Sequence, residues 1–306
     1  MIKLIIFGCQ KITLDIIEFL EKQENVLILK LFTYEIPSDF ARTNLSVEKE
    51  AKKRNINVSN LKKVSDQAVN EIKKLSPDLI VSSYYRKILP KEIYSCAKIA
   101  INIHPSFLPY YRGPVPTAWA ILNGEKNFGV SIHKITEGID SGDIYVQKSF
   151  KIKPLETGYE LHNRAMKKGS ELFKKSFFKI ATGKIKPKPQ KKGGSYYGIL
   201  KQNIFINWSD TKNNIINKVR VRAKPYNPMA TYLYSKYLII NKIIPYKGNI
   251  FIQRPGIILK VLKNDKLLVS VADGAVIIDE YDFFPSLTEH EKLIYIKAGN
   301  RFVSKD

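Results

Sequence analysis

Short apolar runs alternate with helical patterns along the first third of the chain. The runs are rich in Ile, Leu, Val and Phe, and they cover residues 2–7, 26–33, 78–83 and 99–103. Helical patterns separate them, at 12–20, 47–53, about 66–75 and just after Pro90. Strands that alternate with helices favour a mostly parallel sheet with helices on both faces. The sequence therefore predicts an α/β, Rossmann-like N-terminal domain.

The last of these runs carries two polar residues. Residues 101–112 read I-N-I-H-P-S-F-L-P-Y-Y-R, so Asn102 and His104 are two positions apart and share one face of the predicted strand. The prolines after His104 predict an extended loop with no helix before about Pro116. Polar groups at the C-terminal end of a strand, beside a loop, lie where α/β proteins place their chemistry.

Two more strands, over 128–134 and 143–151, and a helix over 157–181 complete the predicted first domain. Thr157, with Glu160 three residues later, is typical of the start of a helix. The Lys-, Pro- and Gly-rich stretch at 183–195 has the composition of a linker.

The C-terminal part is predicted to be β-rich. A helix over about 210–222 is expected among short strands, at 204–207, 231–244, 256–262, 266–271 and 275–282. Short strands with frequent turn signals favour a small barrel of the OB type. We therefore expect an N-terminal domain over 1–182, a linker over 183–203 and an OB-like barrel domain over 204–306.

The chain is strongly basic, since 51 Lys and Arg residues against 28 Asp and Glu give a formal net charge of +23. Such a charge suits an anionic partner or substrate, including nucleic acid. Compositional drift explains it equally well, because Lys, Ile and Asn are abundant everywhere and the basic clusters at 184–192 and 218–224 lack interleaved aromatics. Both interpretations stay open at this point.

The two cysteines, Cys9 and Cys96, are far apart and have no metal-ligand spacing, so we expect neither a disulfide framework nor a metal site. The run at 2–7 is too short for a signal peptide, and no apolar stretch approaches the ~18 residues of a membrane span. We therefore expect a cytoplasmic protein that does not bind membranes.

Asp140 is a candidate partner for the polar pair, because it lies in a glycine-flanked loop between two predicted strands. A carboxylate beside His104 would orient the imidazole and raise its basicity, and the Asn102 amide could donate to an oxyanion. Such a set suits acyl transfer to an amine. Spacing alone leaves open that His104 is a structural core residue and Asp140 a turn former.

The stretch N-I-H-P-S-F-L-P-Y-Y-R-G at 102–113, followed by E-G-I-D-S-G-D at 137–143, resembles the 10-formyltetrahydrofolate-dependent formyltransferases. Trp208-Ser209 and K-V-R-V-R-A-K-P-Y-N-P at 218–228 resemble the start of their C-terminal domain. The resemblance implies N10-formyltetrahydrofolate as co-substrate and no metal. It also implies catalytic roles for Asn102, His104 and Asp140.

The same resemblance implies that two loops form the folate site. The residues expected to bind the folate are Arg86, Ile88, Leu89, Pro90, Glu137, Gly138 and Ile139. The residues expected to contact the acceptor substrate are Tyr85, Ser106 and Arg112. Strand-end packing is the alternative role for Tyr85, and a cap or turn is the alternative for Ser106.

Three classes of acceptor are open within this resemblance. Glycinamide ribonucleotide formyltransferases are shorter than this chain. Methionyl-tRNA formyltransferases have the full length, but they usually carry a basic Gly/Pro-rich insertion after the second strand. The corresponding stretch here, Thr33 to Val47, is short and nearly neutral.

Sugar N-formyltransferases fit better, because S-S-Y-Y-R-K-I-L-P at 82–90 and G-G-S-Y-Y-G at 193–198 resemble their versions of these segments. Tyr and Arg side chains near the site suit a nucleotide diphosphate. We therefore expect a nucleotide-linked amino sugar as acceptor, used in surface polysaccharide (O-antigen, lipopolysaccharide) biosynthesis. Nucleic acid is not the expected partner, and methionyl-tRNA is the alternative acceptor.

Two further hypotheses remain. A basic nucleic-acid-binding protein could use an inactive scaffold of this kind, although burial of an unused His–Asp pair would be costly. A homodimer is also possible, since the apolar segment Tyr237 to Ile240 is a candidate edge strand.

Overall fold

The computed structural model describes residues 1–34, 45–60, 65–200, 203–250 and 254–303. The chain divides into two compact units. The N-terminal unit comprises residues 1–119, 127–151 and 162–199, and the C-terminal unit comprises residues 120–126, 152–161 and 200–306. The domain boundaries expected at 182 and 203 stay a prediction.

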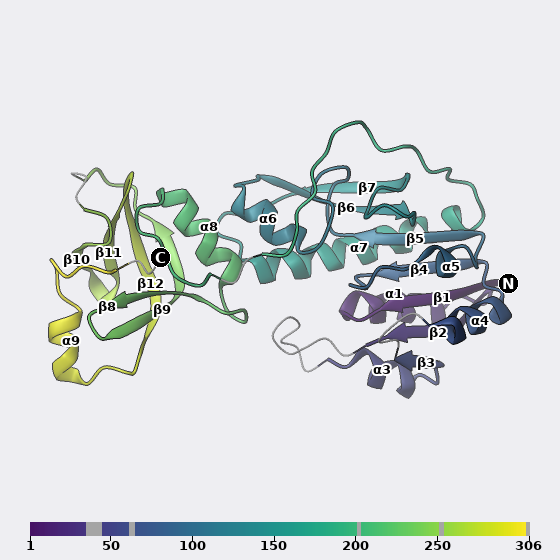
Figure 1. Cartoon of the computed structure of the whole chain (residues 1–306), viewed down its shortest axis with the longest axis horizontal. Coiled ribbons are helices and arrows are strands. Elements are labelled where there is room, and N and C mark those ends of the chain that lie inside the picture. Colours follow the sequence, from purple (N-terminus) through teal and green to yellow (C-terminus); the bar gives the residue numbers. More distant parts are fainter. Residues whose placement is uncertain (35–44, 61–64, 201–202, 251–253, 304–306) are drawn as a thin grey trace. The chain divides into compact units, whose positions relative to one another are not determined.

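The N-terminal unit is built on a seven-stranded sheet with the order β3-β2-β1-β4-β5-β6-β7 (Figure 1). Its strands are β1 (Ile2–Gly8), β2 (Val26–Thr33), β3 (Val58–Asn60), β4 (Leu79–Ser83), β5 (Ile99–His104), β6 (Asn127–Lys134) and β7 (Ile144–Lys151). The first five run parallel, while β6 is antiparallel to β5 and to β7. The predicted α/β class with a mostly parallel sheet is confirmed.

Helices pack on both faces of this sheet. They are α1 (Lys11–Glu21), α3 (Val47–Lys53) and α7 (Gly158–Ala181) on one face, and α4 (Asp66–Leu75) and α5 (Lys91–Tyr94) on the other. Helix α6 (Pro116–Leu122) follows the loop after β5. The last part of α6 and the first part of α7 belong to the C-terminal unit. The start of α7 follows the sequence prediction, because Thr157 and Glu160 exchange hydrogen bonds in a capping box.

The alternation of side chains along β1 explains the two layers of helices. Leu4 and Ile6 point to one face, where they join a core with residues of α1, α3 and α7. Ile5 and Phe7 point to the other face, where they join a core with residues of α4 and α5. A strand buried on both faces reads as a continuous apolar run, which is why β1 was visible in the sequence.

The strand order determines where the polar end of β5 lies. From β1, the chain adds β2 and β3 on one side of the sheet, and then reverses direction and adds β4 and β5 on the other side. In open α/β sheets, the carboxyl ends of strands near such a reversal form the ligand-binding edge. Asn102 and His104 lie at the carboxyl end of β5, one strand beyond the reversal.

The C-terminal unit contains an antiparallel five-stranded sheet with the order β10-β11-β12-β9-β8. Its strands are β8 (Met229–Leu233), β9 (Lys236–Pro245), β10 (Ile258–Val261), β11 (Leu267–Val271) and β12 (Gly274–Phe284). Helices α8 (Lys212–Arg222) and α9 (Glu289–Tyr295) and a 3₁₀ turn at Lys263–Asp265 accompany it. The predicted β-rich C-terminal domain is confirmed.

Three details of this unit differ from the prediction. The run at 231–244 forms two strands, β8 and β9, because Tyr234 takes a positive φ of 53° and turns the chain. The stretch at 204–207 forms only a single bridge, between Phe205 and Ala230. The segment Tyr237 to Ile240 is not an edge, since β9 pairs with β8 on one side and with β12 on the other.

The segment after α7 is bound to the N-terminal unit as far as Ile199. Lys188 forms an antiparallel bridge with Ile144 at the start of β7, and Tyr196 forms a parallel bridge with Arg112. In Figure 1 this segment leaves the end of α7 and passes β7. We call residues 184–198 the strap.

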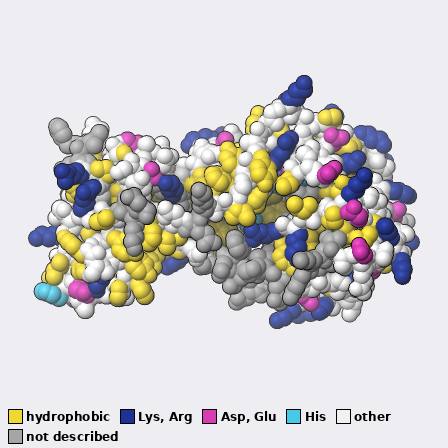
Figure 2. Space-filling view, viewed as in Figure 1, with side chains coloured by type: hydrophobic (Ala, Val, Ile, Leu, Met, Phe, Trp, Pro, Cys, Tyr) yellow, Lys and Arg dark blue, Asp and Glu magenta, His cyan; other side chains and the backbone are white. Residues whose placement is uncertain are grey.

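Two further observations concern the distribution of charge and the helices. On the face shown in Figure 2, Lys and Arg side chains are scattered among uncharged and apolar ones and do not gather in one patch. Within the described ranges, we find no helix that is both long and apolar enough to cross a membrane.

Candidate active site

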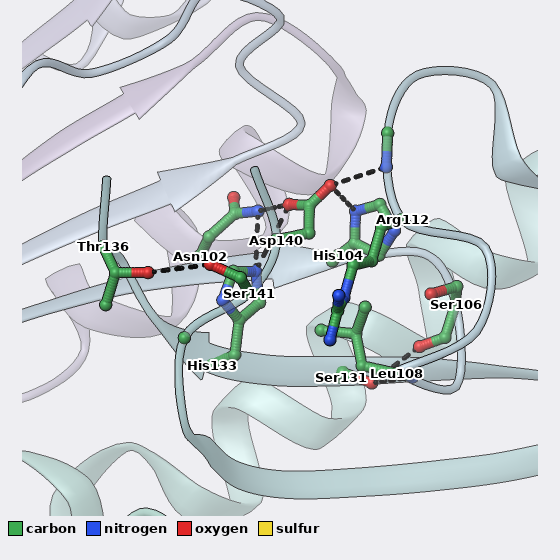
Figure 3. Close-up of polar contacts among 12 residues, drawn as sticks. Asn102, His104, Ser106, Leu108, Arg112, Ser131, His133, Thr136, Asp140 and Ser141 are labelled. Carbon is green, nitrogen blue, oxygen red and sulfur yellow. Dashed lines mark hydrogen bonds and ion pairs between the residues drawn. The ribbon is translucent and has the colours of Figure 1, made fainter. Parts of the chain in front are cut away.

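The structure brings Asn102, His104 and Asp140 together at the carboxyl end of β5 (Figure 3). Asn102 and His104 come from the strand itself, and Asp140 comes from the loop between β6 and β7. Asn102 Nδ2 lies 3.3 Å from Asp140 Oδ1, and His104 Nδ1 lies 3.5 Å from Asp140 Oδ2. The carboxylate therefore lies between the amide and the imidazole.

The backbone holds Asp140 in place from a third direction. The amide N–H of Gly113 donates to Asp140 Oδ2 at 2.9 Å. Gly113 has a φ of 96°, and a side chain on it would meet the carbonyl oxygen of Tyr197 at 2.4 Å, so glycine is required here for the close approach. Asp140 itself has a φ of 49°, a conformation that costs a non-glycine residue about 1–2 kcal/mol.

The imidazole of His104 is buried, and one of its nitrogens is fixed. Nε2–H donates to the carbonyl oxygen of Tyr111 at 3.0 Å, so in the neutral ring Nδ1 carries the lone pair. Burial lowers the pKa of His104 below its ordinary value of 6.5, although Asp140 and the bond to Tyr111 act in the opposite direction. The resting imidazole is neutral at pH 7, and Nδ1, beside Asp140, is the atom that can take a proton.

Asp140 is ionised in the same site. Burial alone would raise the pKa of its carboxyl group, but His104, His133 and the Gly113 amide outweigh burial and hold this pKa well below its ordinary value. A largely buried carboxylate beside a neutral imidazole stabilises the imidazolium that forms once the ring accepts a proton.

A fourth polar residue, His133, belongs to this cluster and was missed in the sequence. It pairs with Asn102 across β5 and β6, and its Nε2 lies 3.2 Å from Asn102 Nδ2 and 3.5 Å from Asp140 Oδ1. Nδ1–H donates to the carbonyl oxygen of Lys134 at 2.9 Å, which leaves Nε2 free to accept from Asn102. The signal was available as a polar residue inside the apolar run 128–134, but its partner depended on strand register.

The two hydrogens of the Asn102 amide are both engaged in this arrangement. One faces Asp140 Oδ1 and the other faces His133 Nε2, at 3.3 and 3.2 Å. Both distances are at the long end for hydrogen bonds, so the cost of exchanging either for a stronger acceptor is small. The amide can therefore redirect one N–H toward an oxygen that gains negative charge.

The residues expected to bind the folate lie in loops next to the trio. Ile88 and Ile139 expose 70% and 43% of their surface, and Arg86, Glu137 and Gly138 are also exposed. Leu89 is buried in the core beneath β4, and Pro90 precedes α5. Two exposed apolar side chains, one on each loop, offer surface for a flat aromatic ring. Their assignment to folate binding stays a prediction.

The residues expected to contact the acceptor have other contacts as well. The ring of Tyr85 packs against Phe7 and Tyr34, which favours the packing role over a free stacking surface. Ser106 is fully buried and donates its hydroxyl to the carbonyl of Tyr110, which favours the turn role. Their assignment to substrate binding stays a prediction.

Arg112, the third of these residues, is partly buried and is held by another side chain. Its Nε and Nη2 donate to Oε1 of Gln190 in the strap, at 3.2 and 2.7 Å.

The stretch Thr33 to Val47, on which the choice of acceptor partly depends, lies largely outside the described residues. Among those described, no group of three or more His, Cys, Asp or Glu side chains is arranged to hold a metal ion.

Comparison with known proteins places these motifs in a family. The family model for formyl transferases matches residues 30–176, and the model for the formyl transferase C-terminal domain matches residues 199–283. The methionyl-tRNA formyltransferase of Clostridium tetani is 35% identical over 246 residues, which cover 78% of this chain and 77% of the relative. That of Sulfurihydrogenibium sp. is 33% identical over 266 residues, which cover 84% of this chain and 85% of the relative.

A solved structure shares the fold along almost the whole chain. The N-formyltransferase of Helicobacter canadensis, in complex with folinic acid and dTDP-3-aminofucose, aligns with a TM-score of 0.70 at 24% identity. The alignment covers 92% of this chain and all of that one. On the two family models and the relatives above 30% identity, this chain belongs to the formyl transferase family of enzymes, as its sequence motifs predicted.

Proposed function

We propose that this protein transfers a formyl group from N10-formyltetrahydrofolate to the amino group of a nucleotide-linked amino sugar. The observation that carries the proposal is the state of His104. Its Nε2–H is fixed by Tyr111, while Nδ1 faces the ionised Asp140 carboxylate in a buried setting. A base of this kind is suited to an amine that must lose a proton as it forms a C–N bond.

His104 and Asp140 act together in the proposed reaction. The amine attacks the formyl carbon, and His104 Nδ1 accepts the proton that the amine loses. The resulting imidazolium is stabilised by Asp140, since a carboxylate 3.5 Å away in a buried site has strong electrostatic influence. His104 then returns the proton to the nitrogen that leaves the formyl carbon.

Asn102 supplies the remaining interaction. As the formyl oxygen gains charge, it becomes a stronger acceptor than His133 Nε2, and the Asn102 amide redirects one N–H to it. His133 and Asp140 hold the amide plane in the resting site. Stabilisation that arises only as charge develops accelerates the chemical step and does not merely tighten binding.

The folate fits the exposed loop residues beside the trio. Ile88 and Ile139 present apolar surface, and the exposed backbone around Gly138 is accessible to polar edges of a pterin ring. Leu89, buried in the core, anchors the first loop. The residues that surround the reacting atoms are thus separate from those that hold the carrier.

A nucleotide-linked amino sugar is supported as acceptor by three observations. The Helicobacter canadensis enzyme, which aligns with 92% of this chain, was solved with dTDP-3-aminofucose. The segments at 82–90 and 193–198 resemble those of sugar N-formyltransferases, and Thr33 to Val47 has no basic Gly/Pro-rich insertion. Surface polysaccharide biosynthesis is the corresponding role.

Methionyl-tRNA is the second candidate acceptor, because relatives of that name are 33–36% identical to this chain. The formal charge of +23 also suits a polyanion. The absence of a concentrated basic patch on the face shown in Figure 2 does not add support to this candidate.

An acceptor panel distinguishes the two. Purified protein is incubated with N10-formyltetrahydrofolate and, in turn, with dTDP-, UDP- and GDP-linked amino sugars and with charged initiator methionyl-tRNA. We expect release of tetrahydrofolate and a formylated product with one of the nucleotide sugars, and much slower product formation with the Asp140→Asn protein. Formylation of methionyl-tRNA alone would refute the sugar assignment.

Removal of the imidazole or the carboxylate should abolish most of the activity. We expect His104→Ala and Asp140→Asn to lower kcat by about 10²–10⁴-fold, the range for loss of general acid–base catalysis, with the fold retained. His290→Ala is the matched control, because it removes an exposed imidazole from the C-terminal unit. Wild-type kcat in either site variant, with near-native thermal unfolding, would show that the pair is misassigned.

The chain has four histidines, so the titration of His104 can be followed by NMR. We expect its pKa to lie below 6.5, and to fall further in Asp140→Asn, because that change removes the charge that favours the imidazolium. Activity should therefore be level near neutral pH and decline in acid as Nδ1 becomes protonated. A His104 pKa above 6.5, or one that rises in Asp140→Asn, would contradict this account.

A further inference from the structure

Gln190, in the Lys- and Pro-rich strap, makes four hydrogen bonds beside the catalytic trio. Its Oε1 accepts from Nε and Nη2 of Arg112, at 3.2 and 2.7 Å. Its Nε2 donates to the carbonyl oxygens of Asp140 and Gly142, at 2.7 and 2.8 Å. Both N–H donors of this amide and both acceptor positions of its oxygen are thus used.

These bonds join two loops that otherwise come from different parts of the sheet. Arg112 lies in the loop after β5, next to the Gly113 amide that donates to Asp140. Asp140 and Gly142 lie in the loop between β6 and β7. Gln190 therefore ties the residue that carries the carboxylate to the loop whose backbone holds that carboxylate.

The Asp140 loop needs such support. A positive φ at Asp140 costs about 1–2 kcal/mol, and the contacts from Asp140 to the imidazoles of His104 and His133 are 3.5 Å long. The two bonds from Gln190 to backbone carbonyls are shorter and act on the loop itself. They fix the backbone from which the carboxylate projects.

Gln190 also determines what Arg112 does. The guanidinium belongs to the residue just before Gly113, whose N–H already contacts Asp140. An Arg released from Gln190 could pair with this carboxylate, since bidentate pairing is the preferred geometry for Arg and Asp. Pairing would divert the charge of Asp140 from His104.

The strap is anchored on both sides of Gln190, so the amide is held in place. Lys188 bridges to Ile144 before it. After it, Ser195 Oγ accepts from the Tyr111 amide at 2.9 Å, and the Tyr197 ring stacks on Tyr111 and Trp119. Tyr111 supplies the carbonyl that fixes His104 Nε2, so the strap supports both halves of the catalytic pair.

We propose that Gln190 is a positioning residue of the reaction: it fixes the Asp140 loop relative to His104 and keeps the Arg112 guanidinium from the carboxylate. The inference rests on the proposed role of His104 and Asp140 but not on the identity of the acceptor. It assigns a function to the strap, whose composition indicated only a linker.

Two variants test it. Gln190→Leu removes all four bonds and leaves an apolar side chain that is one bond shorter. Gln190→Glu can still accept from Arg112, but it places a carboxylate oxygen against the carbonyls of Asp140 and Gly142. We expect both to lower kcat by about 10–100-fold, as for a small displacement of a catalytic group, with a smaller change in KM for the folate.

The second readout is the NMR titration of His104, which needs no acceptor. In Gln190→Leu the pKa of His104 should fall, because Asp140 is less well placed and Arg112 is free to pair with it. The other groups that face His104, namely His133 and the Tyr111 carbonyl, are unchanged by the substitution. Lys188→Ala is the control on the same strap: its side chain is exposed, its bridge to Ile144 uses the backbone, and both readouts should match wild type.

Normal kcat together with an unchanged His104 pKa in Gln190→Leu would overturn the inference. An equal loss of kcat in Lys188→Ala would also overturn it, because the effect would then be a general one of the strap. If Gln190→Leu does not fold, kcat in Gln190→Glu decides between the same two results. Because the titration is independent of the acceptor, a wrong acceptor and a wrong role for Gln190 give different outcomes.

Discussion

One largely buried carboxylate, that of Asp140, organises the site. Asp140 receives an N–H from Gly113, faces the Asn102 amide, and lies between the imidazoles of His104 and His133. Burial of a charge is unfavourable unless hydrogen bonds and opposite charges compensate. The surrounding loops can be understood as the means of supplying these partners, and the ionised carboxylate in turn makes Nδ1 of His104 a useful proton acceptor.

The fold brings these partners from three places. Strand β5, the last parallel strand, ends with Asn102 and His104, whose side chains lie beside Asp140 (Figure 3). Strand β6 pairs with β5 in the antiparallel direction, and this register places His133 opposite Asn102. The loop after β5 supplies Gly113, and the strap returns from the end of α7 to bind both loops through Gln190 and Ser195. The site therefore depends on contacts between segments that are distant in the sequence.

The sequence predicted the parts of this arrangement that depend on local pattern. Strands β1 and β4 are buried on both faces of the sheet, so each was predicted from a continuous apolar run. Side chains alternate between the two faces along β5, which placed Asn102 and His104 on the same face. The capping box at Thr157 was also local. The turn at Tyr234 was missed because Ser235 is the only usual turn residue in it, and no Gly, Pro, Asn or Asp marks it. Strand β3 was missed because Val58–Asn60 holds one apolar residue in three positions.

Tertiary contacts account for the rest. His133 gained its role through register with Asn102, and Gln190 through a strap whose composition resembles a linker. Neither role can be read from neighbours in sequence. The identity of the acceptor is harder still to predict from the sequence, because it depends on surfaces outside the catalytic trio.

The most direct test of the central claim is a double-mutant cycle of His104→Ala and Asp140→Asn, with kcat for formyl transfer as the readout. If the imidazole and the carboxylate act as one unit, the double variant should be about as slow as the slower single variant, because the main contribution of the carboxylate to catalysis is made through the imidazole. Losses that multiply in the double variant would show that the two residues act independently, and would contradict this account of the site.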